Sequence, residues 1–241
     1  MCDGMGGHEA GEVASRLAVD TFAERVAKSR HLLDNKGLKL AQARSMAQEL
    51  VVDWTQVANA AIHERGKHVQ TSSGGDEKDG KSRMGTTLAL AFFVQDFAVV
   101  ANVGDSRVYR LRGASLEKLS QDHVIVADAP RHPADPRPPR KRKFVTRALG
   151  TKPNVEPDVR LLDTRPGDMF VLCSDGLTDL VDDEDIVTTV SKHRDDPRAA
   201  VRALIALANK RGGTDNVTVV LAEVVGAEGD ADDTDELPIT V

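Results

Sequence analysis

Hydrophobic residues at helical spacing predict two helices in the first part of the chain. The first begins at Glu9, directly after a glycine-rich turn, and the second spans residues 40–68. In both, apolar residues recur every three or four positions and therefore share one face of the helix. These faces consist of Val13, Leu17, Ala18 and Phe22 in the first helix, and of Leu50, Trp54, Val57, Ala61 and Ile62 in the second. We expect both helices to pack against a core that contains Trp54.

From residue 86 onward the pattern becomes typical of strands. Thr86–Val94 and Phe97–Val103 are continuous apolar runs, and Arg107–Arg112 alternates between polar and apolar residues. Short turns separate these runs, which indicates a meander of neighbouring antiparallel strands. Three further strands are expected at Val159–Leu162, Asp168–Cys173 and Val217–Val225.

Acidic caps mark two shorter helices in the last third of the chain. Asp182–Asp185 place negative charge at the start of a helix that runs through Val190, where the charge complements the helix dipole. Asp196 followed by Pro197 is typical of a cap and a first-turn proline. Arg211–Gly213 then ends this second helix.

The segment from Asp122 to Lys143 departs from both patterns. It contains five prolines and ends in the basic run Arg140–Lys143. Because prolines at this density oppose helix interiors and central strands, we interpret the segment as an irregular excursion. The basic run fits either a solvated linker or a basic lip over a site for anionic groups. A polar loop at 71–82 and the acidic tail 226–241 are also expected to lack regular structure.

Composition narrows the functional classes. The 241 residues, 40% of them hydrophobic, suit one domain at 1–225 followed by the tail. An aromatic content of 3% and a net charge of -6 argue against nucleic-acid binding, and four clustered cations more often mark a local patch. Cys2 and Cys173 lie too far apart to suggest a disulfide framework. With no apolar run of membrane-spanning length and no signal peptide, we expect a cytoplasmic protein without membrane contact.

Carboxylates stand at the ends of the predicted strands. Asp105 lies in a turn between two strands, Asp175 follows a strand, and Asp215 precedes the last one. Because antiparallel neighbours end and begin at a shared edge of the sheet, these side chains are placed to converge at one rim. Asp3, in the glycine-rich turn Cys2–His8, would join them. Each aspartate alone is more typical of a turn or a helix cap, so the argument depends on their joint placement.

Converging carboxylates suggest divalent metal ions. Their charges repel one another unless a cation lies among them, and Mg²⁺ and Mn²⁺ take oxygen ligands and water. Two such ions about 3.5 to 4 Å apart lower the pKa of a bridging water and hold a phosphoryl oxygen during in-line displacement. The pattern therefore suggests a hydrolase for phosphate esters. From the residues alone, this interpretation and the one of ordinary turns stay in balance.

Other chemistries fit the sequence less well. Neither cysteine belongs to a Cys-x5-Arg phosphate cradle, and no glycine-rich loop ends in Gly-Lys-Ser/Thr as in nucleotide-binding proteins. Ser174 has no evident catalytic triad. The seven histidines are scattered without the spacing of zinc ligands.

Six segments, taken in order, resemble a known family. They are Asp3–His8, Gly85–Thr87, Val103–Arg107, Thr146–Gly150, Ser174–Leu177 and Thr214–Asn216. Together they are similar to bacterial metal-dependent protein phosphatases of the PPM (type 2C) family, from Asp3 to about Val225. The resemblance implies an α+β fold in which an antiparallel β-sandwich is flanked by helices on both sides. It also implies a metal centre at one end of the sandwich.

The resemblance further implies a role for each matching residue. Asp3 would bridge two Mn²⁺ or Mg²⁺ ions, the carbonyl of Gly4 would bind one of them, and Asp175 and Asp215 would complete the protein ligands. Asp3, Asp175 and Asp215 are thus the expected catalytic residues. Water activated by the metals would hydrolyse phosphoserine and phosphothreonine in proteins without forming a phosphoenzyme.

A third, weaker ion and the partners are also implied by the resemblance. Asp105 and Asp179 match the residues that hold this third ion in bacterial members. The substrates would be phosphoproteins that a Ser/Thr kinase modifies, and we expect a monomer.

Three departures from the family pattern bear on these expectations. Met5 stands where eukaryotic relatives have a histidine proposed as general acid, which leaves that task to a metal-bound water or another acid. The Asp122–Lys143 segment coincides with the substrate-facing flap of the family but is rich in proline and basic residues. The chain also begins after a strand pair and an Arg-x-x-Asn-Glu-Asp motif. We expect an under-ligated metal and two missing sandwich strands, unless Met1 lies inside a longer natural chain.

A second hypothesis follows from these departures. The chain would be a catalytically impaired phosphatase-like module that regulates a partner or binds phosphoproteins. The missing upstream motif favours this module. Retention of Asp3, Asp175 and Asp215 favours an enzyme, because a binding module does not need three converging carboxylates.

Overall fold

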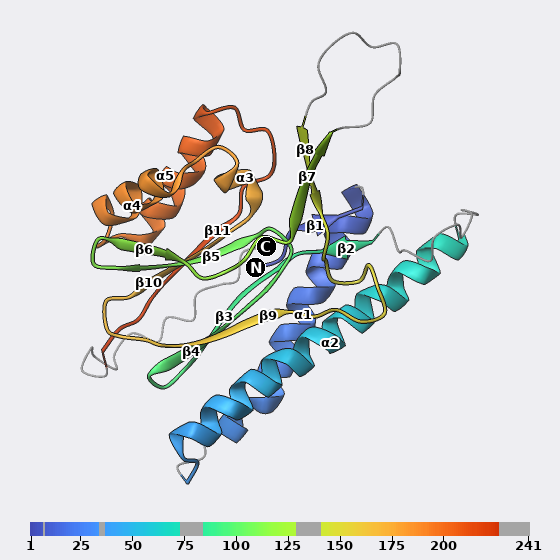
Figure 1. Cartoon of the computed structure of the whole chain (residues 1–241), viewed down its shortest axis with the longest axis horizontal. Helices are drawn as coiled ribbons and strands as arrows, with labels where there is room; N and C mark the ends of the chain where they lie inside the picture. Colours follow the sequence, from blue (N-terminus) through green and yellow to red (C-terminus); the bar gives the residue numbers. More distant parts are fainter. Residues whose placement is uncertain (7, 34–36, 73–83, 129–140, 227–241) are drawn as a thin grey trace.

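Two antiparallel sheets stack face to face at the centre of the molecule (Figure 1). The computed structural model describes residues 1–6, 8–33, 37–72, 84–128 and 141–226. The first sheet has the order β3-β4-β9, with β3 at Leu88–Val94, β4 at Phe97–Val103 and β9 at Asp158–Asp163. The second has the order β11-β10-β5-β6, with β5 at Arg107–Arg112, β6 at Ser115–Lys118, β10 at Met169–Cys173 and β11 at Val219–Glu223.

Helices cover the outer face of each sheet (Figure 1). Two long helices, α1 (His8–Leu33) and α2 (Leu40–Ser72), lie side by side on the first sheet. Three shorter ones cover the second sheet: α3 (Asp175–Thr178), α4 (Asp183–Lys192) and α5 (Pro197–Lys210). The predicted α+β sandwich with helices on both sides is therefore confirmed.

Hydrophobic packing divides into three layers. Trp54 of α2 is buried and meets Phe92 of β3 edge to face, with ring centroids 5.1 Å apart. Between the sheets, Phe93 meets Phe170 in the same way at 4.9 Å. Aliphatic residues of both sheets, such as Ala89, Ala98 and Val108, pack beside them in this middle layer. The expectation that Trp54 belongs to the core is confirmed.

The glycine-rich turn at the start of the chain becomes the short strand β1 (Gly4–Met5). It pairs with β2 (Gly85–Thr86). The backbone of Met1 exchanges two 2.9 Å hydrogen bonds with Ala89, so the segment before β1 runs alongside β3. A Cβ on Gly4 would lie 2.0 Å from the carbonyl oxygen of Gly11, so only glycine fits where β1 touches α1.

Both predicted acidic caps are present. Asp182 accepts a hydrogen bond from the amide of Asp185 at the start of α4, with an N–O distance of 2.9 Å. Asp196 accepts one from Ala199 at the same distance, and Pro197 opens α5. These side chains satisfy amide groups that have no partner within the helix.

The predicted meander is correct for the β3–β4 hairpin and wrong at the next link, from β4 to β5. Strands β4 and β5 belong to different sheets, and the chain crosses from one sheet to the other at Gly104–Ser106. Gly104 has a φ of +102°, and a Cβ there would lie 2.7 Å from the side chain of Thr87. The sharp crossing therefore requires glycine.

The irregular excursion predicted for Asp122–Lys143 is wrong at both of its ends. Strands β7 (Val124–Asp128) and β8 (Lys141–Val145) pair as an antiparallel hairpin that projects from the body (Figure 1). The five prolines all fall between residues 129 and 140, outside the described residues, so they leave the two arms free to pair. The polar loop and the tail, predicted at 71–82 and 226–241, lie almost wholly outside the described residues, and their prediction stands untested.

Among the helices that the structure describes, none has the length and apolar character needed to cross a membrane.

Candidate metal centre

Strand β2 holds the backbone around Asp3. The amide of Asp3 donates to the hydroxyl of Thr87 at 2.9 Å, and the carbonyl of Asp3 accepts from the Thr87 amide and the Thr86 hydroxyl, both at 2.8 Å. The Thr87 hydroxyl also lies 2.7 Å from the hydroxyl of Ser106. Because Ser106 follows Asp105 directly, one buried threonine connects the positions of Asp3 and Asp105.

A similar set of hydrogen bonds positions Asp175 and Asp215 next to the second sheet. The hydroxyl of Ser174, at the exit of β10, donates to the carbonyl of Asn216 at 3.2 Å and accepts from the amide of Thr218 at 3.0 Å. A Cβ on Gly176 would lie 2.2 Å from the same Asn216 carbonyl oxygen. The backbones that carry Asp175 and Asp215 are therefore in direct contact.

The four predicted carboxylates act on one another electrostatically. Burial, followed by the charges of Asp175, Asp215 and Asp105, raises the pKa of Asp3 to about 6. Burial also raises the pKa of Asp175, followed by the charge of Asp105 and then by smaller effects of Asp179 and Asp215. These shifts have the sign expected when like charges share a site without sufficient counter-charge. The predicted grouping is thus visible in the electrostatics of these aspartates, and their roles as metal ligands stay a prediction.

Asp179 joins this cluster from the C-terminal end of α3. It lies four residues after Asp175, and its amide donates to the Asp175 carbonyl at 2.8 Å. Residues at this spacing share one side of a helical turn. About half of the Asp179 side chain is exposed, whereas Asp105 is buried.

One lysine supplies positive charge to the cluster. The ammonium of Lys143, on β8, lies 3.0 Å from Asp179 Oδ1, 3.2 Å from Asp105 Oδ2 and 3.8 Å from Asp175 Oδ2. Burial by itself would lower the pKa of Lys143, but the hydrogen bond to Asp179 and the charge of Asp105 raise it. The lysine therefore stays charged among the carboxylates.

The donor set fits a hard divalent cation. Within the described ranges, no three acidic, histidine or cysteine side chains close on a single point as they would around a bound ion. Three of the carboxylates, those of Asp105, Asp175 and Asp179, instead surround the Lys143 ammonium. All the predicted side-chain ligands are carboxylates, which Mg²⁺ and Mn²⁺ prefer, and their mutual repulsion is what a divalent ion would relieve.

A buried histidine supports the Asp105 turn. The amide of Gly104 donates to Nδ1 of His123 at 3.1 Å, and the amide of His123 donates to the Gly104 carbonyl at 2.9 Å. Nε2 of His123 lies 3.0 Å from Asp158 Oδ2 and 3.2 Å from Arg147 Nη1. Because Nδ1 accepts, Nε2 carries the proton that the Asp158 carboxylate accepts.

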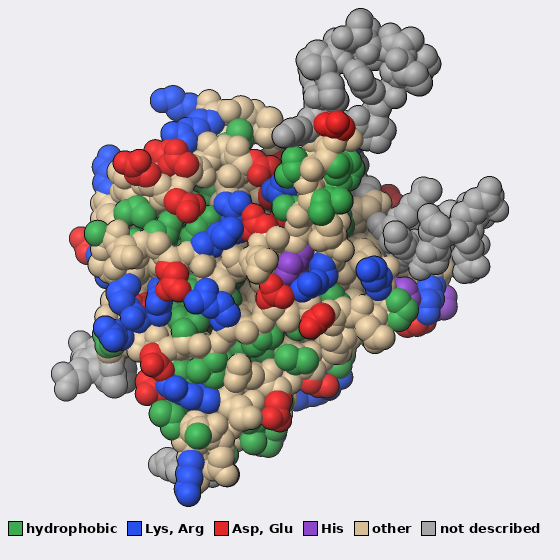
Figure 2. Space-filling model, in the orientation of Figure 1, with side chains coloured by type: hydrophobic (Ala, Val, Ile, Leu, Met, Phe, Trp, Pro, Cys, Tyr) green, Lys and Arg blue, Asp and Glu red, His purple; other side chains and the backbone are tan. Residues whose placement is uncertain are grey.

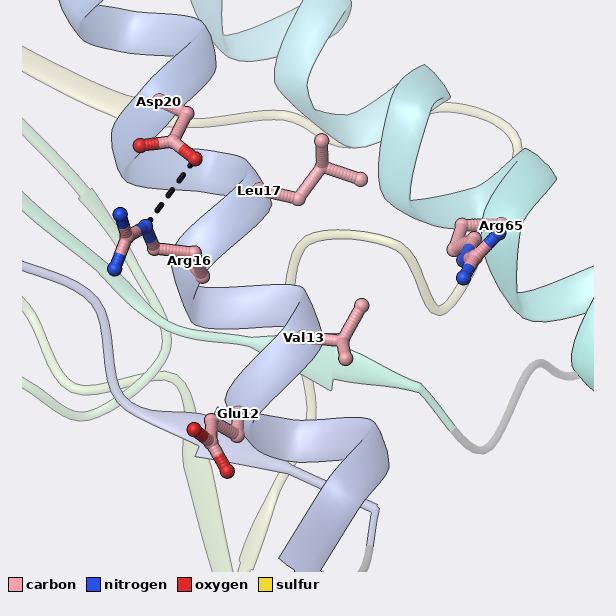
Figure 3. Close-up of a pocket in the computed structure, with 6 residues that line it drawn as sticks. All are labelled: Glu12, Val13, Arg16, Leu17, Asp20 and Arg65. Carbon is pink, nitrogen blue, oxygen red and sulfur yellow. Dashed lines mark hydrogen bonds and ion pairs between the residues drawn. The ribbon is translucent and has the colours of Figure 1, made fainter.

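Two pockets adjoin this region. One of about 560 Å³ lies beside Asp3 and is lined by Cys2, Asp3, Gly4, Glu12, Ser15, Asn216 and Thr218. The other, of about 470 Å³, lies along α1 and reaches Arg65 of α2 (Figure 3), and it is lined by Glu12, Val13, Arg16, Leu17, Asp20 and Arg65. In Figure 3, Arg16 and Asp20 join by a 3.3 Å hydrogen bond, while Val13 and Leu17 point toward α2. Only the first pocket is lined by predicted metal ligands.

Sequence reasoning missed the contributions of His123, Ser174 and Lys143. His123 was one of seven scattered histidines, and Ser174 was considered only as a nucleophile. Their backbone partners come from segments remote in the chain, so local spacing carries no signal for them. The sequence indicated Lys143 only as the last residue of the basic run Arg140–Lys143. One of the two interpretations of that run was a basic lip over a site for anionic groups.

The chain matches the family model described as Protein phosphatase 2C over residues 1–207. The serine/threonine phosphatase stp of Listeria monocytogenes serotype 4b is 33% identical over 234 residues, which covers 92% of this chain and 82% of that protein. The serine/threonine protein phosphatase PstP of Mycobacterium tuberculosis is 35% identical over 233 residues, which covers 93% of this chain and 40% of that protein.

Solved structures show the same likeness. The Mycobacterium tuberculosis phosphatase PstP/Ppp superimposes with a TM-score of 0.69 at 30% identity, over 93% of this chain and 87% of that one. The catalytic domain of PstP in complex with two manganese ions gives a TM-score of 0.67 at 31% identity, over 93% and 86% of the two chains.

Proposed function

Because this chain belongs to the protein phosphatase 2C family, we propose that it removes phosphate from phosphoserine and phosphothreonine in proteins by metal-dependent hydrolysis. The observation that carries the proposal is the grouping of Asp3 with Asp105, Asp175 and Asp215: burial and then the charges of these neighbours raise the pKa of Asp3 to about 6. Such a cluster is unfavourable unless a cation binds it, and dephosphorylation by this family depends on metal.

We propose Mn²⁺ or Mg²⁺ as the metal, with two ions in the main centre. Asp3, Asp175 and Asp215, together with the carbonyl of Gly4, would hold these two ions. Asp105 and Asp179 would hold a third, weaker ion. When bound, the ions supply an activated water and a clamp on the phosphoryl oxygens.

The remaining tasks belong to residues of the chain. Thr87 and Ser174 hold the two pairs of aspartates in place through hydrogen bonds to their backbones and to neighbouring residues. Met5 lies next to Gly4, so the side chain at this position neither donates nor accepts a proton. Protonation of the leaving serine or threonine oxygen therefore requires a water or another acid.

The partners follow from the reaction. The substrates are phosphoproteins, which we propose are modified by a Ser/Thr kinase, and we propose that the protein acts as a monomer in the cytoplasm. The alternative is a catalytically impaired module that regulates a partner or binds phosphoproteins.

Phosphate release from a phosphothreonine peptide, measured against Mn²⁺ concentration, tests the proposal. Release should rise with Mn²⁺, stop when a chelator is added, and disappear in Asp175→Asn. Asp53→Asn, which removes an exposed carboxylate on α2, serves as the matched control and should retain the full rate. A rate that survives the chelator or Asp175→Asn would contradict the metal mechanism. Phosphopeptide binding without any release would instead support the regulatory module.

A further inference from the structure

The β7–β8 hairpin delivers a cation to the acidic cluster. The Lys143 ammonium contacts Asp105, Asp175 and Asp179 at 3.0 to 3.8 Å, and 26% of the lysine side chain is exposed. Two of these carboxylates, Asp105 and Asp179, are those proposed for the weaker ion. A protein side chain therefore lies where that ion would bind.

The hairpin has few other attachments to the body of the molecule. In the described part of the chain, β7 and β8 pair with each other and make only marginal contact with the remaining helices and strands. Ile125 and Val126 are 57% and 64% exposed, and hydrophobic side chains gather on the projecting hairpin (Figure 2). At its base, the amide of Thr146 donates to the carbonyl of His123 at 2.8 Å. Two hydrogen bonds between His123 and Gly104 also tie this base to the Asp105 turn, and along the described strands β7 and β8 the link to the acidic cluster is made by the ion pairs of Lys143.

The ammonium and a divalent ion exclude each other. Mg²⁺ binds oxygen ligands at about 2.0 to 2.1 Å, whereas the ammonium lies 3.2 Å from Asp105 Oδ2 and 3.0 Å from Asp179 Oδ1. An ion on these same oxygens would stand in close contact with a second positive charge. Lysine carries this charge on a flexible stem with several rotatable bonds, so it can withdraw.

We propose that Lys143 competes with the divalent ion for Asp105 and Asp179, and so couples the position of the β7–β8 hairpin to metal binding. With the lysine in place the hairpin is held over the cluster, and when the ion binds the lysine leaves and the hairpin is released. The coupling is reciprocal. Any contact that holds the hairpin against the cluster lowers the affinity for the ion, and binding of the ion weakens the attachment of the hairpin to the cluster. This inference rests on the proposed metal-dependent function.

A charge-matched control lies next to Lys143. The guanidinium of Arg142 is directed at the ring of Phe144, 5.9 Å from its centroid, and forms no ion pair with the cluster among those described. Lys143→Gln and Arg142→Gln each remove one positive charge from β8. Only the first should change metal binding, because successive residues of a strand point to opposite faces.

Isothermal titration calorimetry with Mn²⁺ at low ionic strength, with bound Mn²⁺ counted by electron paramagnetic resonance, tests the competition. The Kd of the weakest site should fall about tenfold in Lys143→Gln, within the usual range of coupling between sites, and stay at the wild-type value in Arg142→Gln. Hydrogen exchange gives a second measurement. Mg²⁺ should speed exchange of the β7 and β8 amides in the wild type, whereas Lys143→Gln should exchange fast without metal.

The outcomes separate this inference from the proposed function. An unchanged weakest Kd in Lys143→Gln, with Mn²⁺-dependent peptide hydrolysis intact, would overturn the competition and leave the phosphatase assignment standing. An equal change in Arg142→Gln would also overturn it, because the effect would then be one of net charge. Absence of Mn²⁺ binding in every variant would overturn both.

Discussion

The amide of Gly104 donates a hydrogen bond to Nδ1 of His123 across 3.1 Å, and this bond holds the residue that precedes Asp105. His123→Ala would remove the acceptor and leave a buried amide without a partner. We expect Mn²⁺ affinity to fall about 10- to 100-fold, as for other residues that position metal ligands. Calorimetric titration measures this loss, and His31→Ala, which changes an exposed histidine on α1, should bind as the wild type does. Equal affinities in the two variants would show that the Asp105 turn does not depend on His123.

At Gly176, the addition of a single methyl group should disturb the candidate metal centre. A Cβ there would lie 2.2 Å from the carbonyl oxygen of Asn216, so Gly176→Ala must push the Asp175 and Asp215 backbones apart. We expect a loss of stability of about 1 to 3 kcal/mol, typical of overpacking, together with weaker Mn²⁺ binding. Chemical denaturation and metal titration provide the measurements. Gly226→Ala, whose Cβ would lie 3.8 Å from Pro166, should change neither quantity.

Asp168 offers a prediction about pH that is independent of the metal. Its buried carboxylate accepts two hydrogen bonds from Arg112, each 2.6 Å long, and one from the amide of Arg165. Burial alone would raise the pKa of Asp168, but the bonds from Arg112 and Arg165 lower it. The charged form therefore stabilises the fold above the unfolded pKa of about 4, and this stabilisation is lost as the pH falls through the lowered value.

Asp168→Asn should accordingly be destabilised by about 2 to 3 kcal/mol at pH 7, the usual loss for a hydrogen bond to a charged group. The difference from the wild type should shrink as the pH falls below about 4, where the wild-type carboxyl also becomes neutral. Urea denaturation at several pH values measures it. A difference that stays constant down to pH 3 would mean that the charge of Asp168 is not what stabilises the fold.

Asp3 should have the opposite dependence in the absence of metal. Because its pKa is raised to about 6, the folded protein retains a proton that the unfolded chain releases above about pH 4. Metal-free protein should therefore lose stability as the pH rises from about 4 to about 6. Thermal melting in a chelator, compared between the wild type and Asp3→Asn, isolates this contribution. We expect the Tm of the wild type to fall relative to the variant across this window, and Mn²⁺ to restore it at pH 7.

Much of the fold was predictable because local patterns agree with the final structure. The caps at Asp182 and Asp196 define where α4 and α5 begin, and apolar runs define β4 and β10. The crossing at Gly104–Ser106 was not predictable, because a hairpin and a change of sheet use the same turn residues. The β7–β8 arms were obscured by the prolines between them, although Val124–Val126 has the β-branched character of a strand.

The carboxylates of the candidate site were predictable from their places at strand ends, but for a different geometric reason. We expected convergence along the edge of one sheet, whereas Asp105 lies at the crossing between two sheets and Asp175 follows a strand of the second. The resemblance to a family supplied Asp179, which no pattern of strand ends indicates. The Lys143 contacts depend on how the hairpin folds back, and this is a tertiary property that sequence spacing does not encode.

The separation of the apolar core into layers has a mechanical consequence. Asp3 is held by Thr86 and Thr87, which lead directly into β3 of the first sheet, while Asp175 and Asp215 adjoin strands of the second sheet, and each sheet packs against helices of its own. Ions shared by these three aspartates would cross-link the two halves at one end of the sandwich, in addition to the apolar contacts between the sheets, such as that of Phe93 with Phe170. Metal binding should therefore make the two halves unfold together as one unit, and removal of the metal should let them unfold separately.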